Sequence, residues 1–266
     1  MPSPKPRLAA YHRVDRCGKK GRLMKKYNYH DFLAHFGIGA AHPGGFALTK
    51  ELTKSESLSP QHKVLEVGCG TGQSAAYLAQ TYGCQVTAIE PHPLMLQKAA
   101  QRFRKERLPI QLIQGSSEKL PFPGESFDFL LAESVTIFTN IVPSLKEYAR
   151  VLRPGGVVLD IDMTAGLALT KAQQEEFKEL YSIPYVPTER EWKKAFRLAG
   201  FRLANVVKKG TVASALSPKQ HQYLEQPEWN PSAYIDPSLY DIWGKHQDIT
   251  QKYANQMQYV AYRLVK

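Results

Sequence analysis

Short apolar runs alternate with longer amphipathic segments between residues 45 and 163 of the chain. Each run is bounded by turn residues, and the segments between the runs repeat their apolar residues at helical spacing. Runs this short and this uniformly apolar are typical of strands that are buried on both faces of a parallel sheet. The pattern predicts covering helices between strands at 63–67, 84–89, 110–114, 127–132 and 156–162.

Helix start and stop signals agree with this alternation. Gly83 follows an apolar helical run as a C-terminal stop, and Pro93 and Pro143 stand where a first helical turn accepts proline. Farther along the chain, Thr188 and Glu191 have the spacing of a capping box. Strands and helices in this order predict an α/β fold with a mostly parallel sheet.

The C-terminal part of the chain departs from the alternation. Two more strands are predicted at 201–210 and 259–266, and they bring the expected sheet to seven strands. A tight turn would suffice to join them, so the long segment between them is an added element. In this segment, Ser217-Pro218 and Asp236-Pro237 predict two helix starts. We therefore expect an N-terminal arm and lid (1–44), a core (45–213), a helical cap (214–258) and the last core strand (259–266).

Composition excludes several classes of protein. The chain has 266 residues, 43% of them hydrophobic, without an apolar run that could span a membrane or act as a secretion signal, so we expect a cytoplasmic location. Cys17, Cys69 and Cys84 lack the spacing of a metal site, and Cys69 and Cys84 are expected to be small core residues. The eight histidines are scattered, so no metal site is predicted.

The net charge of +11 is concentrated at one end of the chain. Residues 1–27 hold nine Lys or Arg and a single acid, whereas the remainder is nearly balanced. Charge blocks of this kind are commonly solvated arms. An arm that closes over an anionic ligand or contacts RNA is the alternative, and both stay open.

The turn Gly68-Cys69-Gly70-Thr71-Gly72 follows the first predicted strand. A dinucleotide fingerprint would place its third glycine at residue 73, which is Gln73, and no Lys-Ser or Lys-Thr follows as in a phosphate-binding loop. Glu66 precedes the turn, where a carboxylate would repel a pyrophosphate and attract a cationic amino group. Glu90 ends the second strand, where it can accept from a ribose diol. A ribose site beside an ammonium site describes S-adenosylmethionine better than NAD.

Five sequence blocks then carry a family resemblance. In order, they are "VLEVGCGTG", "AIEPHPLML", "QGSSEKLPFPGESFDFLLAESV", "LKEYARVLRPGGVVLDIDM" and "TEREWKKAFRLAGF". Over residues 42–210 the chain resembles the class I S-adenosylmethionine-dependent methyltransferases, in particular the small-molecule, methyltransferase type 11 branch that includes ubiquinone- and menaquinone-type enzymes. The resemblance implies a Rossmann-like fold, methyl transfer from S-adenosylmethionine to a small-molecule acceptor, and S-adenosylhomocysteine as product.

The resemblance also implies the cofactor-binding positions. The glycine turn would surround the methionine part, Glu90 would bind the ribose hydroxyls, and Met95 would lie against the adenine, although Met95 also has the spacing of a core residue. Where such enzymes usually show Gly-Asp-Ala, this chain reads Gly115-Ser116-Ser117, so a serine hydroxyl or the Ser117 amide would contact the adenine edge. The implied residues are Glu66, Gly68, Cys69, Gly70, Gly72, Glu90, Met95, Ser116, Ser117 and Glu133, the last through its backbone or that of a neighbour.

Acceptor residues are sought outside the elements common to the fold. Methyl transfer is an in-line displacement, so no catalytic triad is expected, and the candidates for proton transfer are His42, His35 and Glu133. The turn at 41–45, "AHPGG", is either a mobile turn over the cofactor or a plain helix start. In the cap, the rings of Trp229, Tyr234, Tyr240 and Trp243 either line the acceptor site or pack the cap onto the sheet.

Two other functions compete with this interpretation. A nucleic-acid methyltransferase acting on amino groups would carry Asn or Asp before Pro-Pro-aromatic after the fourth strand, where this chain has "AESV". Cytosine-C5 chemistry would need a cysteine beyond that strand, and all three cysteines precede it. A non-catalytic S-adenosylmethionine-binding regulatory protein is the other alternative, which the serines at 116–117 favour. We expect a monomer or a homodimer.

Overall fold

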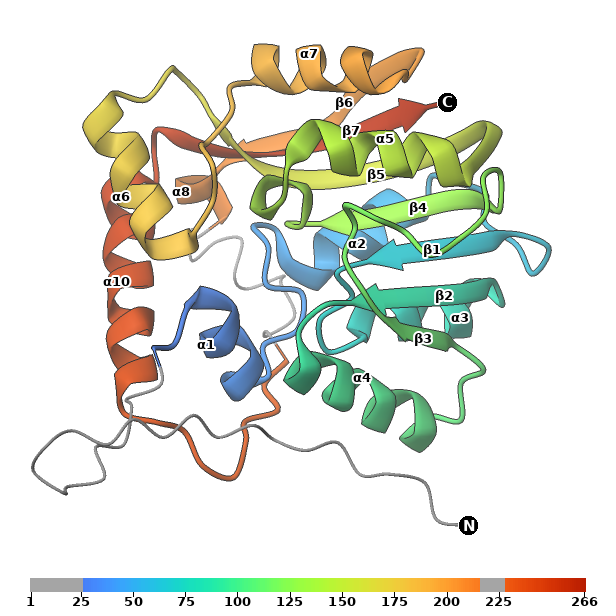
Figure 1. Ribbon diagram of the computed structural model, residues 1–266, viewed down its shortest axis with the longest axis horizontal. Helices are drawn as coiled ribbons and strands as arrows, with labels where there is room; N and C mark the ends of the chain where they lie inside the picture. Colours follow the sequence, from blue (N-terminus) through green and yellow to red (C-terminus); the bar gives the residue numbers. More distant parts are fainter. Residues whose placement is uncertain (1–25, 216–227) are drawn as a thin grey trace, which may run out of the picture.

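Seven strands form one sheet in the order β3-β2-β1-β4-β5-β7-β6 (Figure 1). The computed structural model describes residues 26–215 and 228–266. Strands β1 to β5 pair in parallel, and β7 is antiparallel to both β5 and β6. This confirms the predicted seven-stranded, mostly parallel sheet. The strands are β1 (Lys63–Val67), β2 (Gln85–Glu90), β3 (Gln111–Gln114), β4 (Phe127–Glu133), β5 (Leu152–Ala165), β6 (Leu203–Thr211) and β7 (Met257–Val265).

The helices begin and end largely at the predicted signals. Gly83 ends α3 in a left-handed conformation, Pro93 is the first residue of α4, and Thr188 and Glu191 form a capping box at the start of α7. The helical elements are α1 (Tyr29–Phe36), α2 (Gly45–Thr53), α3 (Gln73–Tyr82), α4 (Pro93–Lys105), the 3-10 helix η1 (Thr136–Phe138), α5 (Ile141–Val151), α6 (Lys171–Tyr181), α7 (Glu189–Ala199), α8 (Val212–Ala215) and α10 (Ser238–Tyr253).

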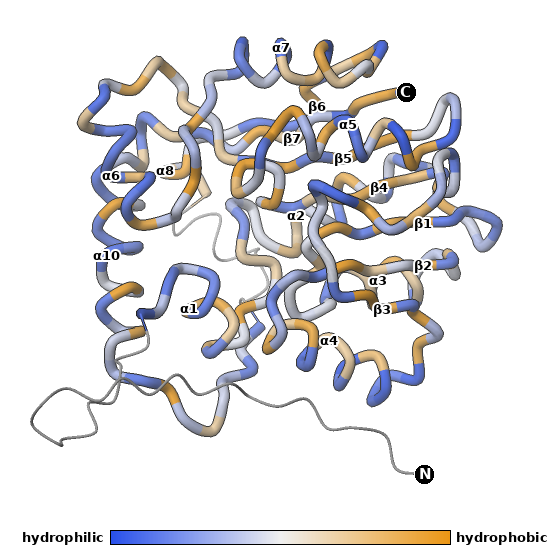
Figure 2. The backbone as a smooth tube through the Cα atoms, viewed as in Figure 1, coloured by the Kyte–Doolittle hydropathy of each residue, from blue (hydrophilic) through white to orange (hydrophobic). Residues whose placement is uncertain are grey.

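Helices cover both faces of the sheet because successive strand residues point to opposite sides. In β1, Val64 packs in a hydrophobic cluster with residues of α2, α3 and α4, whereas Leu65 packs in a second cluster with residues of α1, α5, α6, α7 and α10. Figure 2 shows the pattern in α4, whose hydrophobic residues face the sheet while hydrophilic residues follow its outer edge. Cys69 and Cys84 lie in the first cluster, as expected of small core residues.

Four helices lie beyond the carboxyl ends of the parallel strands: α1, α6, α8 and α10 (Figure 1). There α10 contacts α1, α6 and α8, and α1 also contacts α4. Ligands of open α/β sheets bind at this edge. Residues from the two ends of the chain therefore come together over the edge of the sheet where a ligand is expected.

Two covering segments are joined to each other and to α4. Ile38 and Trp229 form an antiparallel bridge, and Asn230 N donates to Gly37 O at 3.0 Å. The buried Lys98 of α4 donates to the carbonyl of Asn230. The α1 end and the chain at 228–232 thus form one covering unit.

The second of the two predicted helix starts can be assessed. The structure describes α10, which begins at Ser238 with Pro237 as its cap, and Asp236 Oδ1 accepts from Ser238 N at 3.0 Å. The start predicted at Ser217-Pro218 and the basic residues 1–25 lie outside the described residues. Within 26–215 and 228–266, every helix is too short or too polar to cross a membrane.

Candidate functional site

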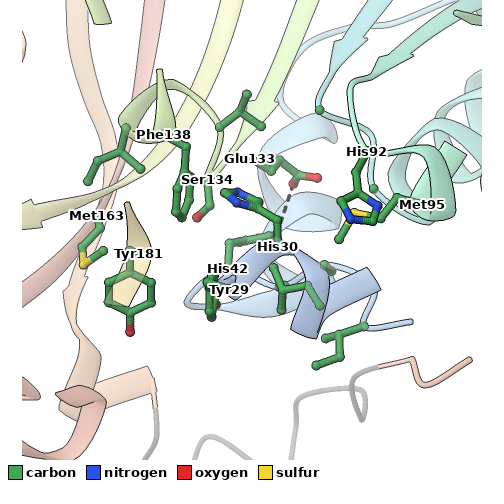
Figure 3. A pocket seen from close by; sticks show the side chains of 18 of the residues that line it. Tyr29, His30, His42, His92, Met95, Glu133, Ser134, Phe138, Met163 and Tyr181 are labelled. Atoms are coloured by element: carbon green, nitrogen blue, oxygen red, sulfur yellow. Dashed lines mark ion pairs between the residues drawn. The ribbon is translucent and has the colours of Figure 1, made fainter. Parts of the chain in front are cut away.

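A cavity of about 810 Å³ opens at the carboxyl edge of the sheet. Figure 3 shows His92 and Met95 at one end, Met163 and Tyr181 at the other, and Glu133 and Ser134 between them. We call the first end the glycine-loop half, lined by Glu66, residues 68–71, Gln73, Ser74, residues 90–93, Met95 and residues 116–118. The second end is the aromatic half, lined by residues of α1, η1, α6 and α10 together with Met163 and Met257.

The three glycines of the turn are needed for different reasons. All have positive φ angles, 61° at Gly68, 54° at Gly70 and 78° at Gly72. A Cβ would come within 2.5 Å of the Val135 side chain at Gly68, and within 2.6 Å of the Phe103 ring at Gly72. At Gly70 it would meet only Met95 Sδ, at 3.8 Å. Gly72 packs against α4 and does not line the cavity, whereas Gly70 leaves open space for close approach of a ligand.

Glu90 is fixed by backbone amides at the end of β2. Its two carboxylate oxygens accept from Gly70 N at 2.9 Å and from His92 N at 2.8 Å. Burial raises the pKa of Glu90, and these two hydrogen bonds oppose the rise. Each oxygen has a second lone pair, so the carboxylate can still accept from a ligand diol.

Glu66 presents an unsatisfied oxygen to the same half. The side chain is 3% exposed, and Oε2 is buried without a hydrogen-bond partner in the described part of the chain. Burial raises the pKa of Glu66 well above its ordinary value, and the neighbouring Glu133 raises it further. A buried carboxylate oxygen without a partner carries a free-energy penalty that a cationic ligand group would relieve.

Glu133 belongs to a buried polar cluster between the two halves. Its carboxylate accepts from Ser74 Oγ at 2.5 Å and from Thr49 Oγ1, and it lies 3.3 Å from His42 Nε2 (Figure 3). Burial acts to raise the pKa of Glu133, but His42, Ser74 and Thr49 together hold it below its ordinary value. Two predicted proton-transfer candidates, His42 and Glu133, are therefore paired with each other at the cavity wall.

Ser134, directly after β4, is the neighbour of Glu133 and falls within the predicted cofactor contact of Glu133 or a neighbour. Its φ angle is +52°, a left-handed conformation that is uncommon for serine, and its amide donates to Ile161 O at 2.7 Å. It lines the cavity between the halves. The only feature of the amino-acid sequence that points to Ser134 is its position directly after the fourth strand.

The remaining cofactor candidates also line the glycine-loop half: Cys69, Met95, Ser116 and Ser117. The Ser116 hydroxyl accepts from Glu118 N at 3.2 Å, and the Ser117 hydroxyl lies 3.4 Å from that of Ser144. Burial raises the pKa of the Cys69 thiol well above its usual range, so the side chain stays a neutral thiol.

The aromatic half is built from rings that are far apart in the sequence. Tyr29 of α1 meets Tyr181 of α6 edge to face, with ring centroids 4.8 Å apart, and it stacks on Phe138 with centroids 6.1 Å apart. Tyr181 Oη lies 2.8 Å from Nδ1 of His246 of α10. Sequence reasoning singled out none of these four residues for the site, since each is an ordinary member of an apolar or amphipathic segment.

The predicted acceptor residues divide into two groups. Trp229 and Trp243 line the cavity. Tyr234 and Tyr240 do not, and they are 68% and 51% exposed. His35 is also absent from the lining, and its ring packs edge to face against Tyr27 at 5.5 Å. Within the described ranges no cluster of three or more His, Cys, Asp or Glu side chains could hold a metal ion.

Comparison with known proteins identifies the family. Residues 65–160 match the methyltransferase domain family. The chain is 36% identical over 229 residues to the uncharacterized methyltransferase YodH of Bacillus subtilis (strain 168), covering 86% of this chain and 95% of that protein. It is 33% identical over 135 residues to the demethylmenaquinone methyltransferase of Chlorobaculum tepidum, covering 50% and 54% of the two chains.

A solved structure shares the fold. Phosphoethanolamine N-methyltransferase 2 of Haemonchus contortus, solved in complex with S-adenosyl-L-methionine, superposes with a TM-score of 0.67 at 18% identity, over 88% of this chain and 56% of that one. The unsatisfied Glu66 oxygen, the open space at Gly70 and the Glu90 acceptor suit an ammonium group and a ribose. The chain belongs to the class I S-adenosylmethionine-dependent methyltransferases.

Proposed function

We propose that the protein methylates a small, largely apolar acceptor that is bound in the aromatic half of the cavity. The observation that carries the proposal is the continuity of the cavity: carboxylates and glycines line one half, rings line the other, and Ser134 lies where they meet. An apolar chamber of this kind, at the carboxyl edge of the sheet, suits a small molecule better than a nucleic-acid strand.

The glycine-loop half would hold the cofactor, which supplies an electrophilic methyl carbon when bound. Glu66 Oε2 would accept from its ammonium group, Glu90 would accept from its ribose hydroxyls, and Gly70 would allow its close approach. Met95 would contact the adenine, with Ser116 and Ser117 at the adenine edge. These roles are supported by the unsatisfied oxygen of Glu66 and by the cavity lining.

The chain's contribution to the reaction would be alignment and exclusion of water. The bridge between Ile38 and Trp229 joins the two parts of the cover, and the rings that line the cavity would surround the acceptor. The His42–Glu133 pair is the candidate for holding or moving a proton at the imidazole Nε2. The division into a lid up to residue 44 and a cap at 214–258 stays a prediction, as do a cytoplasmic location and a monomeric or dimeric state.

A labelling experiment tests the class of acceptor. The purified protein is incubated with methyl-labelled S-adenosylmethionine and a cell extract separated into small-molecule, RNA and protein fractions. We expect label in the small-molecule fraction, equimolar S-adenosylhomocysteine, and little of either with Glu90→Ala. Label in the RNA fraction would support the nucleic-acid alternative instead. Binding without any S-adenosylhomocysteine would support the regulatory one.

A further inference from the structure

Charge is distributed unevenly in the cavity. Its carboxylates are Glu66, Glu90, Glu118 and Glu133, and all of them come from the glycine-loop half or the boundary. In the described part of the chain, the aromatic half is lined by no Asp, Glu, Lys or Arg side chain. A charged acceptor group would therefore lose its water there without gaining an opposite charge, which is costly.

One polar pair faces this apolar chamber. Tyr181 Oη and His246 Nδ1 lie 2.8 Å apart, Tyr181 is 5% exposed, and both residues line the cavity. Tyr29 packs against both rings, with centroids 4.8 Å from Tyr181 and 5.2 Å from His246. Phe177 stacks on Tyr181 from the same helix. The pair is thus held in place by rings on several sides.

Both members of the pair are uncharged at neutral pH. Burial lowers the pKa of His246 to about 4, so its imidazole is neutral. Burial raises the pKa of Tyr181 to about 12, and a hydrogen bond from Thr250 opposes the rise, so Tyr181 remains a phenol. A neutral imidazole has one donor and one acceptor, and its bond to Tyr181 uses only one ring nitrogen. Each residue therefore keeps hydrogen-bonding capacity beyond the bond that joins the pair, and a ligand hydroxyl can use it.

We propose that Tyr181 and His246 recognise a neutral hydroxyl group of the acceptor, so that the enzyme selects uncharged hydroxyl-bearing molecules over amines and acids. The inference rests on the proposed function, because it assigns the substrate class of that same chamber. The two residues act in specificity. A ligand of matching shape without the hydroxyl would lose the hydrogen bond to the pair and would bind more weakly.

Three probes of similar shape test the inference. Full-length protein saturated with S-adenosylhomocysteine is titrated with 1-naphthol, with 1-methylnaphthalene, which lacks the hydroxyl, and with 1-naphthylmethylamine, which is a cation. We expect 1-naphthol to bind about tenfold more tightly than 1-methylnaphthalene, the usual scale for one buried hydrogen bond, and the cation to bind most weakly.

Substitutions assign the preference to the pair. Tyr181→Phe and His246→Leu should abolish the tenfold preference while leaving the affinity for 1-methylnaphthalene unchanged. His246→Asn, whose amide can replace Nδ1, should restore part of it. Tyr185→Phe, which removes a hydroxyl outside the cavity, should change nothing.

Four results would overturn the inference. Equal binding of 1-naphthol and 1-methylnaphthalene would overturn it, and so would tightest binding of the cation. In both cases the aromatic half could still be the acceptor site. A uniform loss for all probes in Tyr181→Phe, together with a lower Tm, would reduce the pair to a structural role. If the unmodified protein bound S-adenosylhomocysteine but none of the probes, the proposed acceptor site would fail as well.

Discussion

The two halves of the cavity use different parts of the protein. In the glycine-loop half the backbone fixes the site: the amides of Gly70 and His92 hold Glu90, and the missing side chain of Gly70 leaves room beside them. In the aromatic half, side chains from separate helices form the wall, with Tyr181 and His246 as its polar pair. A site that the backbone forms suits one invariant ligand. A wall of side chains can change its ligand when its residues are substituted. The comparison predicts that cofactor and acceptor binding can be damaged separately.

The largest separate effect is expected for Gly70→Ala. Its Cβ would project into open cavity space, so cofactor binding should fall by about 100-fold or more, since it depends on close approach. The left-handed φ should also cost about 1–2 kcal/mol of stability. Calorimetry with S-adenosylmethionine and thermal unfolding measure the two effects.

Gly155→Ala is the matched control for that substitution. Gly155 also has a positive φ, 79°, with nothing near its Cβ position, and it lies outside the cavity. It should lose comparable stability and keep full cofactor affinity. Equal loss of affinity in both variants would attribute the effect to backbone strain.

Glu90→Ala should have the next largest effect. It removes the proposed diol acceptor and frees the two amides that Glu90 holds, at about 1–3 kcal/mol of cofactor binding. Glu179→Ala, on the exposed side of α6, serves as control. Unchanged affinity in Glu90→Ala would remove Glu90 from the site.

Glu66→Gln should weaken S-adenosylmethionine binding by about tenfold, because the amide keeps the shape without the charge.

In the free protein, burial and Glu133 raise the pKa of Glu66, so its carboxyl retains a proton to higher pH than usual. A cationic ligand favours the ionised form. Cofactor affinity should therefore rise with pH and binding should release protons, both seen by calorimetry in buffers of different ionisation enthalpy. If Glu66→Gln released as many protons on cofactor binding as the unmodified protein, Glu66 would not be the group that loses the proton.

The last effect concerns the free energy of unfolding and belongs to the aromatic half. The pKa of His246 is about 4 in the folded protein against an ordinary 6.5, so the unfolded chain binds the extra proton between these values. The stability that depends on neutral His246 is complete above pH 6.5 and is lost as the pH falls toward 4. His246→Asn should flatten this part of the stability profile in urea titrations. An unchanged slope would place the dependence on other groups.

Sequence could predict the glycine-loop half because its residues lie close together along the chain. Glu66, the glycine turn and Glu90 belong to one β-α-β unit, whose strand ends must share an edge. The same local signals predicted every strand of the sheet. The strand β5 begins at Leu152 and not at 156, because Leu152 pairs with Phe127 before the register shifts.

The aromatic half could not be predicted in this way. Tyr181 and His246 are 65 residues apart and meet only after α6 and α10 pack together. Aromatic composition pointed to the cap in general, but it could not tell the inward ring of Trp243 from the exposed rings of Tyr234 and Tyr240. Which face of a helix is covered depends on its tertiary neighbours.

A crossed titration tests the central claim that one cavity holds two separable sites. The unmodified protein, Glu90→Ala and Tyr181→Phe are each titrated with S-adenosylmethionine and, in the presence of S-adenosylhomocysteine at saturation, with 1-naphthol. We predict that Glu90→Ala weakens only the binding of the cofactor and that Tyr181→Phe weakens only the binding of 1-naphthol. Loss of both ligands in both variants would contradict it, because the halves would then form a single cooperative site.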